Sequence, residues 1–168
     1  WYKVYQLHGL DSALIVADER LALANELADP SKIASATINL AESYAKSGAY
    51  DKAIELLNTL EDETLEDYHR KYRNSVYRTV YGMKYGAALL DRERVDALEK
   101  LRHYRSLSLA ESPVNSSSYY MLQAQRLSDA GMNQEAVAKM EAAKEKLDFS
   151  DNPPMLYTMG EIYLPAGM

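Results

Sequence analysis

The sequence predicts an all-α solenoid of about four helical hairpins followed by one unpaired helix. The 168-residue chain holds only 7 glycines and 5 prolines, which favours long helices over a fold with many turns. Hydrophobic residues make up 47% of the chain, which is enough for a sizeable core. A two-part pattern of small and apolar residues also recurs about every 40 residues, as a helical repeat protein requires.

The first part of the pattern is an apolar residue, a small residue, two variable positions and an aromatic residue. It is complete in residues 40–44, 81–85 and 159–163, and residues 123–127 carry a weaker copy without the aromatic ring. A small residue lets two helices approach closely, and an aromatic ring one turn later fills the groove beside it. We therefore expect each copy to lie in the first helix of a hairpin. The small residues stand 41, 42 and 36 positions apart, at Ala41, Gly82, Ala124 and Gly160.

The second part is an alanine, an apolar residue, two variable positions and another apolar residue. It follows the copies that contain Ala41, Gly82 and Ala124, and it lies in residues 53–57, 97–101 and 136–140. Gly48 and Gly131 each precede the alanine of this second part by five residues. A glycine is favoured where a helix ends in a left-handed backbone and the chain reverses. This part therefore predicts the second helix of each hairpin.

Short connections should make successive helices antiparallel neighbours. We expect a turn and a capped, acidic helix start at 61–64, and a break at 148–154. No low-complexity linker divides residues 1–168, so one repeat domain is expected. The chain opens at Trp1 and its last helix has no partner, so we expect a fragment of a longer protein. The predicted helices are residues 2–8, 11–28, 31–47, 50–60, 64–90, 92–109, 115–130, 133–147 and 154–164.

Composition limits the classes of function. The net charge of −6 argues against direct nucleic-acid contact by this segment, which would need a basic patch. No run of about 18 apolar residues occurs, so no membrane span is expected in it. The chain has no cysteine, which removes thiolate metal sites and cysteine nucleophiles and is compatible with cytoplasm or periplasm. No glycine-rich phosphate loop occurs, and no cofactor is expected.

Residues 38–57, INLAESYAKSGAYDKAIELL, carry the clearest copy of the repeat. The resemblance is to a tetratricopeptide repeat (TPR), at Leu40, Ala41, Tyr44, Gly48, Tyr50, Ala53 and Leu57. It extends over nearly the whole chain and implies a right-handed α-α superhelix with a protein or peptide partner in its concave groove. The usual TPR period is about 34 residues, so the longer spacing here predicts an irregular superhelix.

Two longer stretches, residues 11–60 and 116–147, resemble the N-terminal repeat region of Bacteroides-type membrane-anchored transcription regulators. In that family a TPR sensor region precedes a transmembrane helix, a coiled coil and a C-terminal DNA-binding domain. This segment contains none of those later parts. The resemblance implies a non-catalytic sensor or interaction module and favours the periplasmic side of a membrane-anchored protein.

Motifs for catalysis and metal binding are weak. Ser43 and Lys46 fit the S-x-x-K frame of penicilloyl-serine enzymes, but the accompanying S-D-N and K-T-G elements are missing. His8, His69 and His103 stand in no metal-binding frame, and surface or interhelical hydrogen bonding explains them better. We therefore predict that the chain is not an enzyme and binds no metal.

Five tyrosines form one helical stripe, with spacings of 4, 5, 4 and 4 residues. We interpret the stripe as packing between helices, and the alternative is an aromatic platform for a sugar or peptide. Basic residues on the other faces of the same helix are expected to form a solvated surface. The tyrosines are Tyr68, Tyr72, Tyr77, Tyr81 and Tyr85, and the basic residues are Arg70, Lys71, Arg73 and Arg78.

In TPR superhelices, set positions of each first helix line the concave groove. Chaperone-binding members clamp a C-terminal carboxylate with lysine and asparagine there, but this chain has Ile38, Glu42, Thr79 and Met83, so we reject that ligand. A groove rich in methionine, threonine, glutamine and tyrosine suits an extended peptide or a protein segment. The predicted ligand contacts are Ile38, Glu42, Lys46, Thr79, Met83, Met121, Gln125, Asp129, Tyr157 and Glu161, and Ala87 lies in the same line.

Two alternatives stay open beside the sensor region of a regulator. One is a fragment of a glycan-capturing lipoprotein of the SusD type, whose fold also contains TPRs, and the other is a free-standing TPR adaptor. A homodimer is a further prediction, because the last helix carries an apolar face that we expect to be exposed. This face consists of Met155, Met159 and Ile162.

Overall fold

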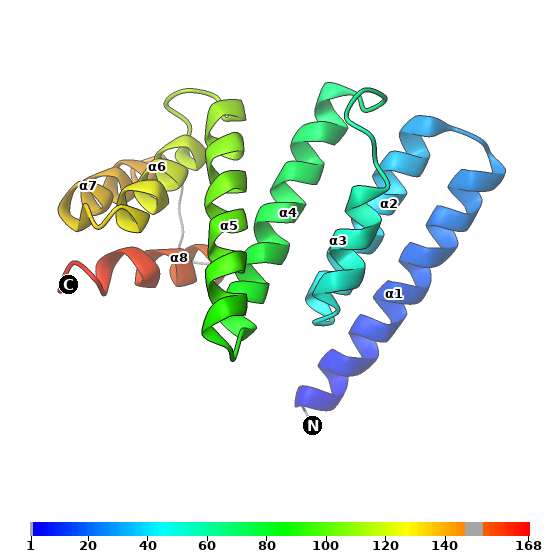
Figure 1. The fold of residues 1–168 in the computed structure, drawn as a ribbon, viewed down its shortest axis with the longest axis horizontal. Coiled ribbons are helices and arrows are strands. Elements are labelled where there is room, and N and C mark those ends of the chain that lie inside the picture. The colour runs from blue at the N-terminus through cyan, green and yellow to red at the C-terminus, as the bar shows by residue number, and fades with distance from the viewer. Residues whose placement is uncertain (1, 147–152) are drawn as a thin grey trace. The chain divides into compact units, whose positions relative to one another are not determined.

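The computed structural model describes residues 2–146 and 153–168, which form eight α-helices and no strand. The all-α fold predicted from the sequence is confirmed (Figure 1). No helix in the described ranges has the length and apolarity needed to cross a bilayer. The helices are α1 (Tyr2–Glu26), α2 (Pro30–Lys46), α3 (Tyr50–Asn58), α4 (Asp67–Ala87), α5 (Asp91–Glu111), α6 (Ser117–Asp129), α7 (Asn133–Lys144) and α8 (Pro153–Tyr163).

The chain is divided into two compact units, Trp1–Leu101 and Arg102–Met168, and the division falls within α5. In the first unit, α2 packs against α1, α3 and α4, and α3 also packs against α4. Successive helices from α1 to α4 run in opposite directions (Figure 1), as short connections predict. In the second unit, α6 packs against α7, and α8 contacts both.

Several predicted helix boundaries differ from the observed ones, and two of the differences have a clear physical reason. Residues 2–8 and 11–28 belong to the single helix α1, which continues through Gly9 and ends at Glu26. A glycine inside a helix costs only about 1 kcal/mol relative to alanine, so it does not by itself end a helix. The helix predicted from residue 64 begins at Asp67, and the hydroxyl of Thr64 donates to the carbonyl of Glu61 at 3.0 Å instead of capping a helix. The predicted break at 148–154 lies largely outside the described residues.

Gly48 and Gly131 end α2 and α6 in the same way. Their φ angles are 86° and 76°, in the left-handed region that glycine adopts without strain. After α2, the N–H of Ala49 donates to the carbonyl of Tyr44 at 2.9 Å, and the N–H of Gly48 donates to that of Ala45 at 3.0 Å. The same two bonds recur around Gly131. Because they satisfy carbonyls that a helix end leaves free, the predicted helix-ending role of both glycines is confirmed.

The small residues of the pattern differ in what they contact. A Cβ added at Gly82 would lie 3.8 Å from Cδ1 of Leu101, which is an ordinary contact distance. A Cβ added at Gly160 would meet no heavy atom of the described residues within 4 Å. The alanines are packed more tightly, and the close helix approach predicted for them is consistent with their complete burial. These alanines are Ala41, Ala53, Ala97, Ala124 and Ala136.

Larger apolar side chains complete a core in each unit. In the second unit, Met140 and Ile162 are fully buried, and Met159 packs against the same cluster. The prediction that Met159 and Ile162 form an exposed face is therefore wrong, because α8 turns this side toward α6 and α7. The side chain of Met155 lies outside the described residues. In the first unit, the largest fully buried side chains are Ile38, Leu57 and Val80.

One cation predicted at the surface is buried. Arg73 is 8% exposed, its Nη1 donates to the carbonyl of Leu60 at 2.6 Å, and its Nη2 pairs with Asp62. The guanidinium therefore ties the turn between α3 and α4 to the side of α4. Arg70 does lie near the surface, where it pairs with Asp67 at 2.5 Å.

Replacing Ala53 with tryptophan tests the phase of the repeat. The alanine has no exposed surface between the helices, so the indole is expected to overpack the pair and lower the free energy of unfolding by about 1–3 kcal/mol or more. Urea denaturation followed by circular dichroism measures this loss. Glu55→Trp, at an exposed position of the same helix, is the control and should change stability by about 0.5 kcal/mol or less. An unchanged midpoint for Ala53→Trp would show that the repeat phase is wrong.

Candidate functional site

The predicted groove positions include three buried residues. Ile38 on α2 has 0% exposure, and Met121 and Gln125 on α6 are also buried. These side chains cannot reach a ligand from solvent, so the prediction that they contact one is corrected. Ile38 and Met121 stand three positions before the small residue of their repeat, and that spacing places them on its buried side. Gln125 is buried although its Oε1 has no hydrogen-bond partner among the described residues.

On α2, the accessible groove positions are already engaged with neighbouring side chains. Glu42 pairs with Lys46 at 2.8 Å. Tyr72, on α4, donates its hydroxyl to Oε2 of Glu42 at 3.0 Å and to Oδ1 of Asn39 at 2.9 Å. Burial, followed by the charge and hydrogen bond of Glu42, raises the pKa of Tyr72 to about 12. Glu42 therefore links α2 to α4, while Lys46 keeps an exposed side chain.

On α4, the predicted positions are more open. The hydroxyl of Thr79 donates back to the carbonyl of Ser75 at 3.1 Å, so the side chain is half-buried against its own helix. Met83 is 37% exposed, and Ala87 is exposed one turn later. These side chains are accessible, and their contact with a ligand stays a prediction.

In the second unit, two predicted groove residues surround one arginine. Nη1 of Arg105 lies 2.7 Å from Oδ2 of Asp129, and Nη2 lies 3.8 Å from Oε2 of Glu161. The arginine side chain is almost fully buried, so the two carboxylates balance a charge that would be costly alone. Asp129 and Glu161 therefore tie α6 and α8 to the last part of α5. The side chain of Tyr157 lies outside the described residues.

A cavity of about 550 Å³ opens in the first unit where α3 begins, α4 ends and α5 begins, and we call it the α3–α5 cleft. Asp51 stands in the first turn of α3 and Lys84 in the last turn of α4, which suits the partial charges of those helix ends. The cleft includes Ala87 from the predicted groove. Its lining residues are Tyr50, Asp51, Lys84, Ala87, Ala88, Arg92, Glu93 and Asp96.

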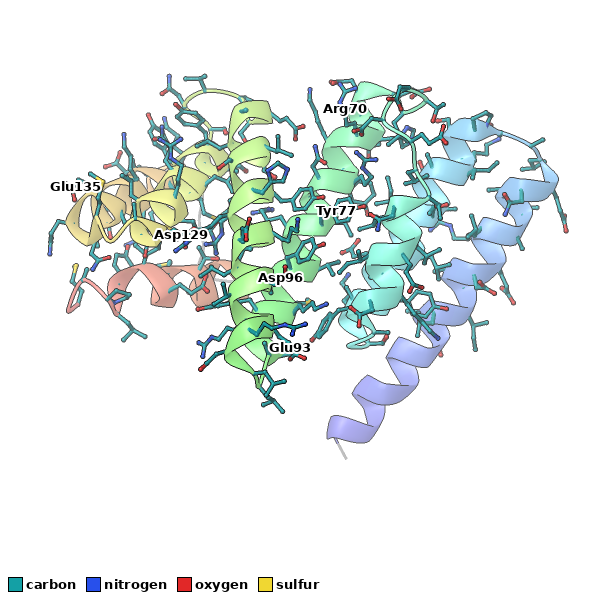
Figure 2. The ribbon with its side chains drawn as sticks, in the orientation of Figure 1. Arg70, Tyr77, Glu93, Asp96, Asp129 and Glu135 are labelled. Atoms are coloured by element: carbon teal, nitrogen blue, oxygen red, sulfur yellow. The ribbon has the colours of Figure 1, made fainter. Side chains whose placement is uncertain are left out.

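Charged side chains dominate the α3–α5 cleft. Lys84 and Asp51 form an ion pair at 2.7 Å near the surface. Figure 2 labels Glu93 and Asp96 on α5, and with Asp51 they give the cleft three carboxylates against two cations. Burial raises the pKa of Tyr81, and the charges of Asp96 and Asp51 raise it further. The carboxylates of two different helices therefore lie close to the same buried phenol.

The sequence pattern did not predict the α3–α5 cleft. The positions chosen from the sequence all belong to first helices of hairpins, whereas the cleft takes most of its charge from the starts of the second helices α3 and α5. The acidic first turn of α5, with Asp91 and Glu93, was the available signal. Such a turn is ordinary at a helix start, so it points to a cleft only once α4 is placed beside it.

The tyrosine stripe has two kinds of environment. Tyr77 and Tyr81 are buried, and their rings stack at 6.2 Å, as packing between helices predicts. Tyr68 is exposed and lies 6.4 Å from the ring of Tyr72. The ring of Tyr85 lies under Arg94, 5.0 Å away. Packing explains the centre of the stripe, and an aromatic platform could involve only its accessible ends.

His69 forms the interhelical hydrogen bond expected of a histidine without a metal frame. Its Nε2 lies 2.7 Å from Oγ of Ser35, and its Nδ1 lies 3.7 Å from the carboxylate of Glu66. Ser35 stands inside α2, where backbone N–H groups are bonded within the helix and cannot form an oxyanion hole. The arrangement therefore joins α2 to α4 and has no means of stabilising an acyl-transfer intermediate.

The remaining catalytic and metal motifs gain no support from their surroundings. Oγ of Ser43 donates to the carbonyl of Asn39 at 3.0 Å, and Lys46 is paired with Glu42 instead of with the serine. His103 is exposed, and the side chain of His8 lies outside the described residues. Within residues 2–146 and 153–168, no three histidine or carboxylate side chains are grouped as a metal site would require.

Comparison with known families agrees with the helical hairpins and their turns. A family profile described as the SusR N-terminal TPR domain matches residues 1–167. No curated protein and no solved structure gives a significant match. The profile match confirms both the TPR resemblance and the narrower resemblance to the repeat region of a Bacteroides regulator. TPR domains generally act in protein interaction and not in catalysis. The chain belongs to the SusR N-terminal TPR domain family.

Proposed function

We propose that this chain is the sensing region of a membrane-tethered transcription regulator, on the periplasmic side of the membrane. The observation that carries the proposal is the family match over residues 1–167, which spans both compact units. In such a protein the TPR region binds a protein or peptide and passes the binding event to other parts of the polypeptide. The family match favours this function over that of a SusD-type lipoprotein.

The α3–α5 cleft is the surface that we propose for this binding. It combines accessible carboxylates with cations in a volume of about 550 Å³, and the exposed Met83 stands beside the lining residue Lys84 in the chain. Three carboxylates against two cations favour a segment that brings a basic side chain. Lys46, Thr79 and Met83 would extend the contact along the first helices, as the sequence predicts.

Charge reversal in the α3–α5 cleft tests this function in the full-length regulator. Glu93→Lys and Asp96→Lys, made together, are expected to reduce the transcriptional response to the inducing signal by about tenfold, because binding is weakened at the sensing end. A reporter gene in the native host measures the response. Glu55→Lys with Glu99→Lys makes the same charge change at exposed positions of α3 and α5 outside the cleft lining and should leave the response unchanged.

Protein level and membrane fractionation are measured alongside the reporter. A full response from the cleft variant, at the normal protein level, would remove the cleft as the binding surface. A full-length protein that remains in the soluble fraction would contradict membrane tethering and favour a free-standing adaptor.

A further inference from the structure

The hairpins α2–α3 and α6–α7 each place their first helix against its partner and against the next first helix. In the first unit, α2 contacts its partner α3 and the next first helix α4. In the second unit, α6 contacts its partner α7 and the next first helix α8. The second helix α3 of one hairpin contacts the first helix α4 of the next. The helix α1 likewise contacts the first helix α2 that follows it, so α1 has the position of the second helix of a hairpin. Among the described residues, no helix lies against both α1 and α2 in the place that a first helix would take.

Beside its contact with α2, the helix α1 carries an exposed apolar stripe. Ala17 and Ala24 are buried on one side of α1. About a quarter turn round the helix from these alanines, Val16, Leu23 and Leu27 are 52%, 55% and 57% exposed. Spacings of 7 and 4 residues place these three side chains on one stripe, about 16 Å long at 1.5 Å per residue. A stripe of this length matches about three turns of another helix packed against α1.

A cavity of about 360 Å³ lies between α1 and α2, and we call it the α1–α2 cleft. Its apolar lining residues include Leu23 and Leu27 of the exposed stripe. Its only two ionisable lining residues, Arg20 and Lys32, are both cations, although the whole chain carries a net charge of −6. The lining residues are Arg20, Leu23, Ala24, Leu27, Ser31, Lys32, Ser35 and Ala36.

The two cations are available to a ligand. Within the described part of the chain, no carboxylate lies within ion-pair distance of Arg20, which is exposed. Lys32 pairs with Asp29 at 3.0 Å, but both groups are accessible, and such a surface pair is weak. The carboxylate of Asp29 also caps α2 by accepting from the N–H groups of Ser31 and Lys32. Asp29 can therefore keep its role in the cap while Lys32 turns to another partner.

We propose that the α1–α2 cleft binds an amphipathic helix of a protein partner, which occupies the place of a first helix against α1 and α2. Apolar side chains of that helix would cover Val16, Leu23 and Leu27, and carboxylates at its edges would pair with Arg20 and Lys32. The inference goes beyond the proposed function, because this cleft shares no residue with the α3–α5 cleft.

A synthetic helical peptide tests the inference on the purified chain. The acidic probe has about 16 residues, with leucines at i, i+4, i+7 and i+11 and glutamates on both flanks of that stripe. The basic probe is identical except that lysine replaces each glutamate. Fluorescence anisotropy of the labelled probes measures binding. The acidic probe is expected to bind saturably, and Leu23→Asp should weaken it by about tenfold or more.

Charge reversal distinguishes a specific cleft from general attraction. Arg20→Glu with Lys32→Glu should weaken the acidic probe by about tenfold or more, and the same variant should gain affinity for the basic probe. This gain also shows that the variant is folded. The matched control is Lys100→Glu with Arg126→Glu, which makes the same charge change at exposed positions outside the cleft and should leave binding of the acidic probe unchanged.

Three results would overturn the inference. One is no saturable binding of the acidic probe to the wild-type chain, and another is equal weakening in the cleft and control variants. The third comes from sedimentation of the chain without peptide. If the wild type self-associates and the Arg20→Glu/Lys32→Glu variant does not, the cleft is filled by a second copy and not by a helix of a partner.

Discussion

Replacing Ile38 with alanine is expected to lower the free energy of unfolding by about 2–5 kcal/mol. The side chain has 0% exposure and stands on α2, the helix that packs against α1, α3 and α4. Removing its outer carbons leaves a cavity that three neighbouring helices cannot close without moving. Urea denaturation followed by circular dichroism at 222 nm measures the loss, since helix content reports on unfolding of an all-α chain.

Ile15→Ala is the matched control for this experiment. It removes the same atoms from a side chain that is 59% exposed on α1, and it should change stability by about 0.5 kcal/mol or less. The comparison also decides between a core and a groove role for Ile38. If Ile38→Ala left the unfolding midpoint unchanged and weakened binding of a partner, Ile38 would be a groove residue, as the sequence predicts.

Replacing Met140 with alanine is expected to cost about 2–5 kcal/mol in the second unit. Met140 is fully buried in a cluster that joins α6, α7 and α8 through Met121, Ala124 and Ile162. Because stability in a repeat protein is roughly a sum of repeat and neighbour contributions, amide hydrogen exchange should accelerate most in α6 and α7. Mass spectrometry of exchanged peptides measures this directly.

Met132→Ala provides the control for the second unit. Met132 is 44% exposed just before α7, so removing the same atoms there should change stability by about 0.5 kcal/mol or less. Equal effects of the two substitutions would contradict the burial of Met140. They would also place the second part of the repeat pattern, residues 136–140, on the wrong side of α7.

The positions and turns of most helices could be predicted from the sequence, because they depend on short spacings. Gly48 and Gly131 end their helices through bonds to residues at most five positions away, so local sequence contains the information. Ala53 and Ala136 are buried because an alanine at that offset from the turn faces the preceding helix. Gly9 gave a misleading signal, since a single glycine lowers helix propensity without ending the helix.

The candidate sites could not be predicted in the same way. Their residues stand up to 46 positions apart in the chain, from Tyr50 to Asp96, and each helix start or exposed stripe is ordinary when considered alone. Arg73 shows the difficulty, because its burial depends on the carbonyl of Leu60 and on Asp62, in a turn more than ten residues earlier. The α3–α5 cleft likewise exists only once Asp51 and Lys84 are brought together.

The sequence by itself therefore determined the all-α class, the hairpin repeat and the residues that let the helices nest. Each of these follows from helix periodicity and from the backbone preferences of glycine and alanine, which act over a few residues. Only the tertiary structure decided that Ile38 belongs to the core, that Asp129 and Glu161 balance Arg105, and that α1 keeps an exposed apolar side. The reason is that burial and ion pairing are properties of a residue's neighbours in space, which residue spacing along one helix does not specify.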